Sequence, residues 1–328
     1  MKIFDCFLFF NELDLLEIRI KLLYNYVDYF VIVESAQTFQ GDSKEFIYEK
    51  NKTRFKQYED KIIHYKIDKY NLNFADLQYI DSPKSLDDEI LNRIYKFIED
   101  CPHFDKKNEF WWGNDFFQRE NIWRALAIAN PSVEDLIFIS DVDEIPNPEI
   151  IFEIKKSVSC NKIVCLRQHE FCYFLNYYHN SDWLGTCCFI YGNFLDKSLN
   201  SIRFSSKRNE GFTPIILEGG GWHFTSLGGV EAIKLKINSW GHKEFNNNIF
   251  LKGVEYNVRH GYDIFRRPGF GNLEYLHLED IRLPASFIKL SDKYQNLIGP
   301  VISRENFLFK HFNKFYFRLI SFLHRTFN

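Results

Sequence analysis

Three acidic residues follow a continuous apolar segment near the middle of the chain. Leu-Ile-Phe-Ile at 136–139 leads through Ser140 into Asp141, Val142, Asp143 and Glu144. Such a run predicts a strand buried on both faces, as in the parallel sheet of an α/β protein. Because side chains alternate along a strand, Asp141 and Asp143 would project to the same side at its carboxyl end.

Two carboxylates that converge at a strand end repel each other unless a cation joins them. Mg²⁺ or Mn²⁺ binds a few carboxylates together with substrate phosphates, and open α/β sheets bind ligands beyond the carboxyl ends of their strands. The acidic cluster therefore predicts a site for a metal-bound diphosphate. The alternative is that Asp141 or Asp143 caps the next helix, with Pro146 in its first turn.

A glycine-rich turn at 219–221 precedes Trp222 and His223 and is a second candidate for chemistry. Glycines let a backbone come close to a ligand, and Trp222 offers a ring on which a sugar can stack. A neutral imidazole is a common metal ligand, so His223 would complete the site begun by Asp143. The alternative is a buried structural histidine in a tight turn.

Candidate ligands for a nucleotide and its phosphates lie elsewhere in the chain. Glu34 and Ser35 end a predicted strand, where a base or ribose is met in nucleotide-binding folds; a helix cap or a solvated loop acid is the alternative for Glu34. Guanidinium groups bind phosphate oxygens in pairs. Arg119 and Arg167 stand out because they lie in apolar contexts, whereas Arg203 is interpreted as a solvated surface charge.

The apolar patterns predict the framework that positions these residues. They predict strands at 3–10, 29–33, 62–67 and 162–166, a strand-rich segment at 171–194, and helices at 115–129, 148–158 and 229–240. We therefore expect an α/β fold with a mainly parallel, Rossmann-like central sheet. A single catalytic domain would span residues 1–300, because no linker or repeat marks a second one.

The composition favours some classes of protein over others. A net charge of -3 and a pI near 6.4 give no reason to expect nucleic acid as a partner. Seven cysteines, an odd number without a Cys-x-x-Cys pair, fit a reduced compartment better than disulfides or zinc. The first strand starts at once and no run is long enough to span a bilayer, so we expect a cytoplasmic location.

Blocks in order along most of the chain resemble glycosyltransferase family 17, which includes the enzyme that adds bisecting β1,4-N-acetylglucosamine to N-glycans. The opening block is FDCFLFFNELDLLE at 4–17; later blocks are VIVES at 31–35, QR at 118–119, SDVDEIP at 140–146, GWHF at 221–224 and RLP at 282–284. The family's animal members carry an amino-terminal membrane anchor and a luminal stem. This sequence shows neither, so we expect a bacterial or viral member that builds a surface polysaccharide or glycoconjugate.

The resemblance implies a GT-A-like domain that transfers a sugar with inversion, most simply N-acetylglucosamine from its UDP ester to a glycan hydroxyl, including that of a lipid-linked acceptor. Asp143 would bind Mn²⁺ or Mg²⁺ directly, and Asp141 would contact the metal or the donor ribose. Inversion also needs a carboxylate that takes the acceptor proton. Glu218, just before the glycine turn, is the first choice, and Asp182, beside Trp183, is the second.

The end of the chain predicts a basic, aromatic helix over residues 301–328. Lys310, Lys314 and Arg318 recur at helical spacing among phenylalanine and leucine residues. This pattern is typical of a helix that lies in the interface of an anionic membrane, on the inner face of the plasma membrane in this case. Docking on the catalytic domain or on a second subunit is the alternative.

Two other classes of function fit parts of the pattern. A sugar nucleotidyltransferase also binds its substrates through an acid-bound metal, but it would normally carry a glycine-rich loop after the first strand. Residues 10–13, Phe-Asn-Glu-Leu, contain no glycine at that place. A non-catalytic carbohydrate-binding protein would be free to lose the three clustered acids, which this chain retains.

Overall fold

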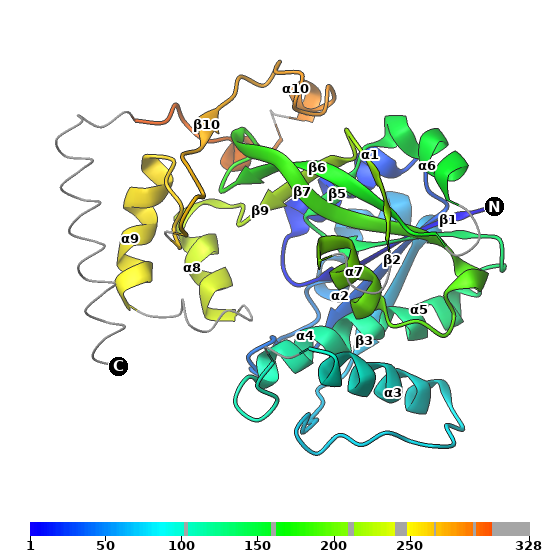
Figure 1. The fold of residues 1–328 in the computed structure, drawn as a ribbon. Coiled ribbons are helices and arrows are strands. Elements are labelled where there is room, and N and C mark those ends of the chain that lie inside the picture. Colours follow the sequence, from blue (N-terminus) through cyan, green and yellow to red (C-terminus); the bar gives the residue numbers. More distant parts are fainter. Residues whose placement is uncertain are drawn as a thin grey trace.

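The computed structural model describes residues 1–101, 104–158, 162–208, 213–239, 248–265, 267–290 and 293–303. Within these residues ten strands form one curled sheet, and helices cover both of its faces (Figure 1). The predicted α/β class is confirmed. No helix in the described ranges has the length and apolarity needed to cross a membrane.

One half of the sheet is parallel and comes from the first half of the chain. Its strands are β1 (Ile3–Phe9), β2 (Tyr29–Ser35), β3 (Ile62–Ile67) and β4 (Leu136–Asp141). The central strand β1 pairs in parallel with β2 on one side and with β4 on the other. Leu8 lies opposite Asp141 and Phe9 opposite Glu34, so the carboxyl ends of three strands meet at one edge.

The other half of the sheet mixes directions. Its strands are β5 (Glu144–Pro146), β6 (Val164–Cys172), β7 (Tyr177–Ile190), β8 (Ile215–Leu217), β9 (Gly221–Thr225) and β10 (Glu274–Tyr275). The strand order is β3-β2-β1-β4-β7-β6-β9-β5, with β10 beside β7 and β8 beside β6. Strand β7 is antiparallel to both β4 and β6, whereas β9 is parallel to β6. The sheet is therefore parallel around β1 and mixed beyond β4.

Each face of the sheet has its own apolar core. One face packs against α1 (Leu13–Leu23), α2 (Ile47–Lys50), η1 (Lys52–Lys61), η2 (Pro148–Ile150) and α6 (Ile151–Ser157). The other packs against α3 (Leu86–Glu99), α4 (Phe110–Glu120), α5 (Ile122–Ala129) and α7 (Leu199–Arg208). Both sides of β1 are buried, which is why its sequence is apolar without alternation.

A third apolar cluster lies beside the ends of β6 and β7. There α8 (Gly229–Ser239) and α9 (Asn248–Arg259) pack against Cys172, Tyr173 and Tyr177, at the end of the sheet away from the N-terminus (Figure 1). The remaining short elements are η3 (Tyr191–Asn193), α10 (Phe287–Leu290) and η5 (Gln295–Leu297). The cluster brings α8 to the edge of the sheet where the acidic residues lie.

One expected helix needs correction, and two other expectations concern residues outside the described ranges. The helix expected over residues 115–129 is two helices, α4 and α5, that meet at the buried Asn121. Asn121 donates a side-chain hydrogen bond to the Phe117 carbonyl, which stabilises this junction. The six described cysteines are free, and Cys160 lies outside the described residues. Residues 304–328, where we expected the basic helix, also lie outside them.

Candidate active site

The acidic turn connects β4 to β5 at the carboxyl edge of the sheet. Asp141 is the last residue of β4, and Glu144 begins the short strand β5. The next helix, η2, is capped by Asn147, whose side chain accepts a hydrogen bond from the Glu149 amide at 3.0 Å. The alternative that Asp141 or Asp143 caps this helix is therefore wrong.

The buried Arg19 of α1 forms hydrogen bonds with the backbone of this turn. Arg19 Nη1 donates to the carbonyl oxygens of Asp141 at 3.0 Å and Glu144 at 2.9 Å, and Nη2 donates to Ser140 Oγ at 2.7 Å. Its charge is balanced by Asp5 on β1, and neither side chain is exposed. Arg19 thus fixes the backbone of the turn, which leaves the carboxylates of Asp141 and Asp143 to face outward.

The third acid, Glu144, points inward and acts as an anchor. Its carboxylate accepts hydrogen bonds from Trp183 Nε1 at 2.9 Å, Arg203 Nη2 at 2.8 Å and the Asp141 amide at 3.1 Å. Glu144 has no exposed surface, and Arg203 is nearly buried. The interpretation of Arg203 as a solvated charge was therefore wrong, because the buried carboxylate holds its guanidinium inside the protein.

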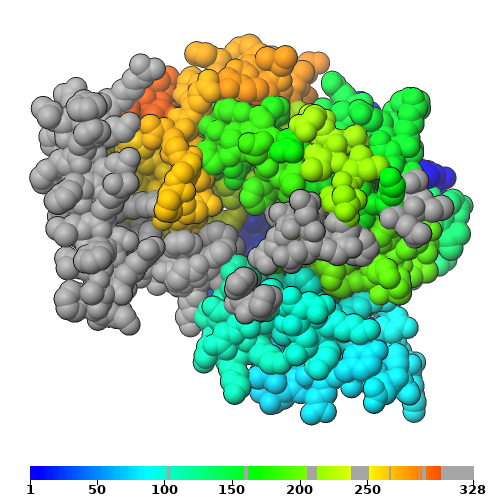
Figure 2. All heavy atoms as spheres, in the orientation of Figure 1, coloured from blue at the N-terminus to red at the C-terminus, as the bar shows by residue number. Residues whose placement is uncertain are grey.

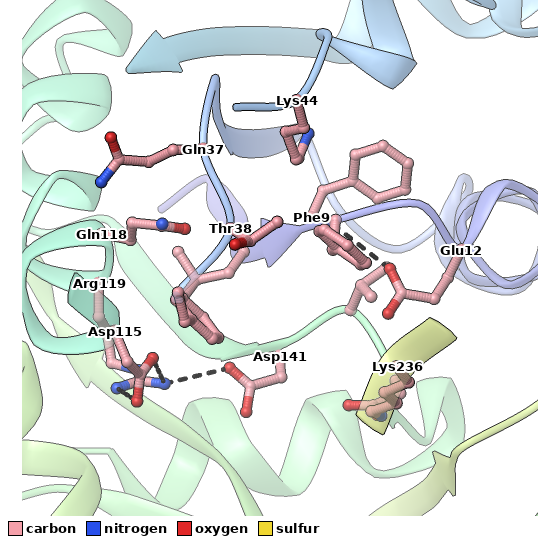
Figure 3. A pocket seen from close by; sticks show the side chains of 15 residues that line it. Phe9, Glu12, Gln37, Thr38, Lys44, Asp115, Gln118, Arg119, Asp141 and Lys236 are labelled. Carbon is pink, nitrogen blue, oxygen red and sulfur yellow. Dashed lines mark hydrogen bonds and ion pairs between the residues drawn. The ribbon is translucent and has the colours of Figure 1, made fainter. Parts of the chain in front are cut away.

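The carboxylates of Asp141 and Asp143 lie near several cationic side chains, at distances longer than those of a close ion pair. Asp141 is 3.4 Å from both Arg119 Nη2 and Arg203 Nη2. Asp143 Oδ2 is 3.5 Å from Lys236 Nζ and 3.8 Å from His223 Nε2. Figure 3 shows Arg119 beside Asp141 and Lys236 on the far side of the same pocket. Both acids therefore line the pockets with cations beside them at distances longer than a close ion pair.

His223 reaches the acids because β9 pairs with β5 and β6. It lies opposite Glu144 in one pairing and Glu170 in the other. The Trp183 ring stacks on its imidazole, with centroids 4.0 Å apart and an angle of 17° between the rings. The predicted proximity of His223 and Asp143 is therefore present in the structure.

Two pockets meet at the acidic turn. The first lies against the carboxyl ends of β1 and β2 and is lined by Phe9, Gln37, Thr38 and Gln118 among others (Figure 3). The second lies between the sheet and α7 and α8, and its lining includes Trp112, Glu170, Trp183, Arg203, His223 and Phe265. Five residues line both pockets: Asp115, Arg119, Asp141, Asp143 and Lys236. In the space-filling view a hollow exposes blue N-terminal atoms at its base (Figure 2).

Burial and charge shift several pKa values in this region. Burial raises the pKa of Asp115, and the nearby charge of Asp141 adds to this effect, although Arg119 opposes it. Burial alone would lower the pKa of Lys236, but the nearby charges of Asp143, Glu12 and Asp141 together outweigh it and raise that pKa. Lys236 is therefore a cation at neutral pH, directed at the acidic turn.

Two of the expected nucleotide ligands lie outside both pocket linings. The buried carboxylate of Glu34 accepts hydrogen bonds from the amides of Ile47 and Tyr48 at the start of α2, and it contacts Lys44 and His64. These contacts match the helix-cap alternative. Ser35 Oγ accepts from the amide of Gln37 and is buried. The neighbouring residues Gln37 and Thr38 line the first pocket instead.

Three further candidates form a cluster of their own on the sheet surface. Arg167 Nε donates to Glu218 at 2.9 Å, and its Nη1 donates to Asp182 at 3.1 Å. Both acids are largely exposed, and all three residues lie outside the linings of the two pockets. Geometry decides which group can act as a general base, so this placement does not support Glu218 or Asp182 in that role.

Trp222 faces away from the site. It belongs to the apolar core on the α1 side, and its Nε1 donates to the Arg282 carbonyl at 2.8 Å. Neighbouring residues of a strand point to opposite faces, so Trp222 and His223 of β9 could not both reach one pocket. Trp183 supplies the aromatic ring in the second pocket.

Sequence reasoning missed Arg19, Glu170, Trp183 and Lys236 as site residues. One signal was available, because Asp5 is the single charged residue of the apolar strand β1. Charged residues are rarely buried unless paired, so Asp5 predicted a buried cationic partner, although not which residue supplies it. Glu170 and Lys236 offered no such signal. Glu170 is placed by the pairing of β6 with β9, and Lys236 is placed by the packing of α8 in the third apolar cluster.

The residue types at the acidic turn are those that bind divalent cations, although among the described residues the three ligand atoms that lie within 4.8 Å of one another are those of Glu170, Cys172 and His179. Asp141 and Asp143 supply carboxylate oxygens, and His223 supplies an imidazole nitrogen 3.8 Å from Asp143. The buried His223 Nδ1 has no hydrogen-bond partner, so the ring is free to present Nε2 to the turn. Oxygen ligands with one imidazole suit Mn²⁺ or Mg²⁺.

The fold and site combine a parallel half-sheet, an acidic turn at its carboxyl edge, and two pockets that meet there. The family model for glycosyltransferase family 17 matches residues 1–93 and 86–267. The chain therefore belongs to glycosyltransferase family 17 and is a glycosyltransferase. A search of the curated proteins finds no match.

Proposed function

We propose that the protein is a metal-dependent, inverting glycosyltransferase with a GT-A-like domain. Its donor would be a UDP-sugar, with UDP-N-acetylglucosamine as the first candidate, and its acceptor a glycan hydroxyl. The observation that carries this proposal is the junction of two pockets at Asp141 and Asp143. A transferase that joins two substrates needs both to reach one point, and the acidic turn is the point that both pockets share.

The first pocket suits the nucleotide. It lies beyond the carboxyl ends of β1 and β2, the position where open α/β sheets bind nucleotides. Phe9, Phe10 and Phe39 offer apolar surface to a base, and Gln37 and Gln118 offer amide groups for hydrogen bonds. This mixture of apolar walls and a few polar groups is typical of small-molecule sites.

The shared residues suit the diphosphate. Asp141, Asp143 and His223 would hold Mn²⁺ or Mg²⁺, which neutralises the leaving diphosphate as a Lewis acid when it is bound. Arg119 and Lys236 line both pockets and would contact phosphate oxygens directly. The two cations are already held near the acids, so they need little reorganisation when a donor binds.

The second pocket suits the transferred sugar and the acceptor. Trp112, Trp183 and Phe265 give it aromatic walls on which sugar rings can stack. The acceptor oxygen attacks the anomeric carbon, the bond to the diphosphate breaks, and a carboxylate takes the hydroxyl proton. We propose Asp115 for this last role because it lines both pockets beside Asp141.

A panel of nucleotide sugars tests the proposal. Purified protein is incubated with Mn²⁺ and each donor, with and without oligosaccharide acceptors, and nucleoside diphosphate release is measured. We expect release with a UDP-sugar, and we expect chelation of the metal to abolish it. Release with a different nucleotide would overturn the donor assignment, and turnover in the presence of chelator would overturn the metal assignment. Binding of glycans without turnover of any donor would favour a carbohydrate-binding protein.

A further inference from the structure

We propose that Glu170 is a positioning residue that orients the His223 imidazole, so that Nε2 presents its lone pair to the Asp141–Asp143 turn. This inference rests on the proposed function, because Glu170 would act on the proposed metal site only through the His223 ring. A carboxylate that accepts the remote ring N–H of a metal-binding histidine fixes both the tautomer and the ring orientation. Nothing in the sequence pattern pointed to Glu170.

The pairing of strands places Glu170 beside His223. The two residues are register partners on the parallel strands β6 and β9, so their side chains project to the same face. Glu170 Oε1 is 3.6 Å from His223 Nδ1, while His223 Nε2 is 3.8 Å from Asp143 Oδ2. The imidazole therefore lies between two carboxylates, with one nitrogen toward each.

The other oxygen of Glu170 is held firmly. His179 Nδ1 and Asn180 Nδ2 both donate to Oε2, the latter at 3.1 Å. His179 is itself fixed, because its Nε2 donates to the Phe270 carbonyl and its ring stacks on Phe270 with centroids 3.7 Å apart. These contacts set the plane of the Glu170 carboxylate and direct Oε1 at His223.

The surroundings of the His223 ring favour a hydrogen bond from its Nδ1 to Glu170. Its Nδ1 is buried without a hydrogen-bond partner, and a buried donor left unsatisfied costs about 1–3 kcal/mol. Trp183 stacks on the ring and is anchored by Glu144, so the ring is restricted to its own plane. A shift of less than about 1 Å toward Glu170 gives a normal hydrogen bond, and the Nε2 lone pair then faces Asp143.

Metal binding measured without catalysis tests this role. Mn²⁺ binding is followed by titration calorimetry, with and without UDP, for the parent, Glu170→Ala, His223→Ala and the double variant. We expect each single variant to raise the Mn²⁺ Kd about 10-fold or more, the range found when a residue that hydrogen-bonds to a metal ligand is removed. The double variant should match His223→Ala, because Glu170 acts through that ring. Glu170→Gln should resemble Glu170→Ala, because its single amide oxygen cannot accept from both the His179 and Asn180 donors and the Nδ1 proton of His223.

A spectroscopic measurement does not require the metal. Long-range proton–nitrogen NMR spectra distinguish the two tautomers, and His223→Ala identifies the signals of this ring. We expect a protonated Nδ1 in the parent and loss of that preference in Glu170→Ala. Thermal unfolding of each variant, with the exposed Glu153→Ala as a matched control, verifies that the fold is retained.

Several outcomes would overturn the inference. An unchanged Mn²⁺ Kd in Glu170→Ala, together with lost transfer, would make Glu170 the general base instead. Additive losses in the double variant would mean that Glu170 acts independently of His223. If the parent binds no Mn²⁺, the proposed metal dependence itself fails, whereas a parent that binds Mn²⁺ with unaffected Glu170 variants refutes only the role of Glu170.

Discussion

Arg19 and Asp5 form an ion pair with no exposed surface, directly beneath the acidic turn. Arg19 Nε donates to Asp5 Oδ2 at 2.8 Å, and the guanidinium lies over the Phe7 ring with its carbon 4.3 Å from the centroid. The same guanidinium donates to backbone carbonyls on both sides of Asp143. The pair therefore links the first helix and the first strand to the residues proposed to bind the metal.

Arg19→Met should lower the free energy of unfolding by about 3–5 kcal/mol, because it leaves Asp5 buried without its partner. Arg19→Met combined with Asp5→Leu should lose less, since no unpaired charge remains. Transfer should stay impaired in both, because the acidic turn has lost its donors. Urea unfolding measures the stabilities, and the exposed Lys106→Met, which removes a surface pair with Glu99, should change stability by less than about 1 kcal/mol. Equal losses in the single and double variants would contradict this account.

Asp143→Ala should abolish transfer while the protein stays folded. The side chain faces the pockets, and the backbone carbonyl that accepts from the Phe224 amide at 2.8 Å is kept. Asp143→Asn should be similarly inactive, because it keeps the size and removes the charge. Turnover above about a tenth of the parent value, equivalent to roughly 1.4 kcal/mol of barrier, would exclude Asp143 as a metal ligand.

Asp115→Asn should lower kcat by about 100-fold or more with little change in the donor KM, as expected for loss of a general base. Burial and the charge of Asp141 raise the pKa of Asp115, so activity of the parent should fall as the pH drops through that raised value. Steady-state kinetics over a range of pH measures both effects. If Asp115→Asn keeps the kcat of the parent, the proton acceptor is another group.

Gly221 and Gly219 make a matched pair of glycines with positive φ, at 125° and 63°. A Cβ at Gly221 would overlap the Ile145 carbonyl oxygen on β5 and the amide of Asn147, which follows β5, whereas one at Gly219 would meet nothing within 4 Å. Gly221→Ala should therefore cost at least about 3 kcal/mol and reduce transfer, because β5 continues the acidic turn. Gly219→Ala should cost only about 1–2 kcal/mol. Equal losses would mean that the close approach at Gly221 is not limiting.

Much of the architecture was predictable because it depends on local patterns. The apolar runs of β1, β2 and β4 predicted a parallel sheet that is buried on both faces. Because ligands bind at the carboxyl edge of such a sheet, the position of Asp141 and Asp143 at a strand end predicted that they belong to the site. The glycine turn was predicted to approach a ligand closely, but Gly221 approaches the backbone of β5. Sequence alone could not show which partner a glycine accommodates, because that depends on the pairing of β9 with β5.

The less predictable part of the site depends on contacts between distant segments. Glu218 was chosen for its nearness in sequence to His223, yet Arg167 holds it on the sheet surface. Glu170 is 53 positions from His223 in the chain and reaches it through strand register. Long-range register is set by the whole sheet, so no local pattern revealed it. The opposite orientation of Trp222 and His223 was predictable, because neighbouring side chains of a strand point to opposite faces. The two side chains could therefore not line the same pocket.

Glu17 on α1 should make the stability of the fold depend on pH in the acid range. Burial alone would raise the pKa of Glu17, but hydrogen bonds from Lys293, Lys21 and Arg54 outweigh it and lower that pKa to about 2. A depressed folded-state pKa stabilises the fold above the unfolded value, near 4.5, and this contribution is lost as the pH falls from there toward about 2. Glu17→Gln should therefore be less stable than the parent at neutral pH, and the difference should shrink through that window. Urea unfolding at a series of pH values measures the difference, with the exposed Glu153→Gln on α6 as the control. A difference that stays constant from pH 5 to pH 2 would show that Glu17 does not carry this linkage, and that its contacts with Lys293 and Arg54 contribute little in solution.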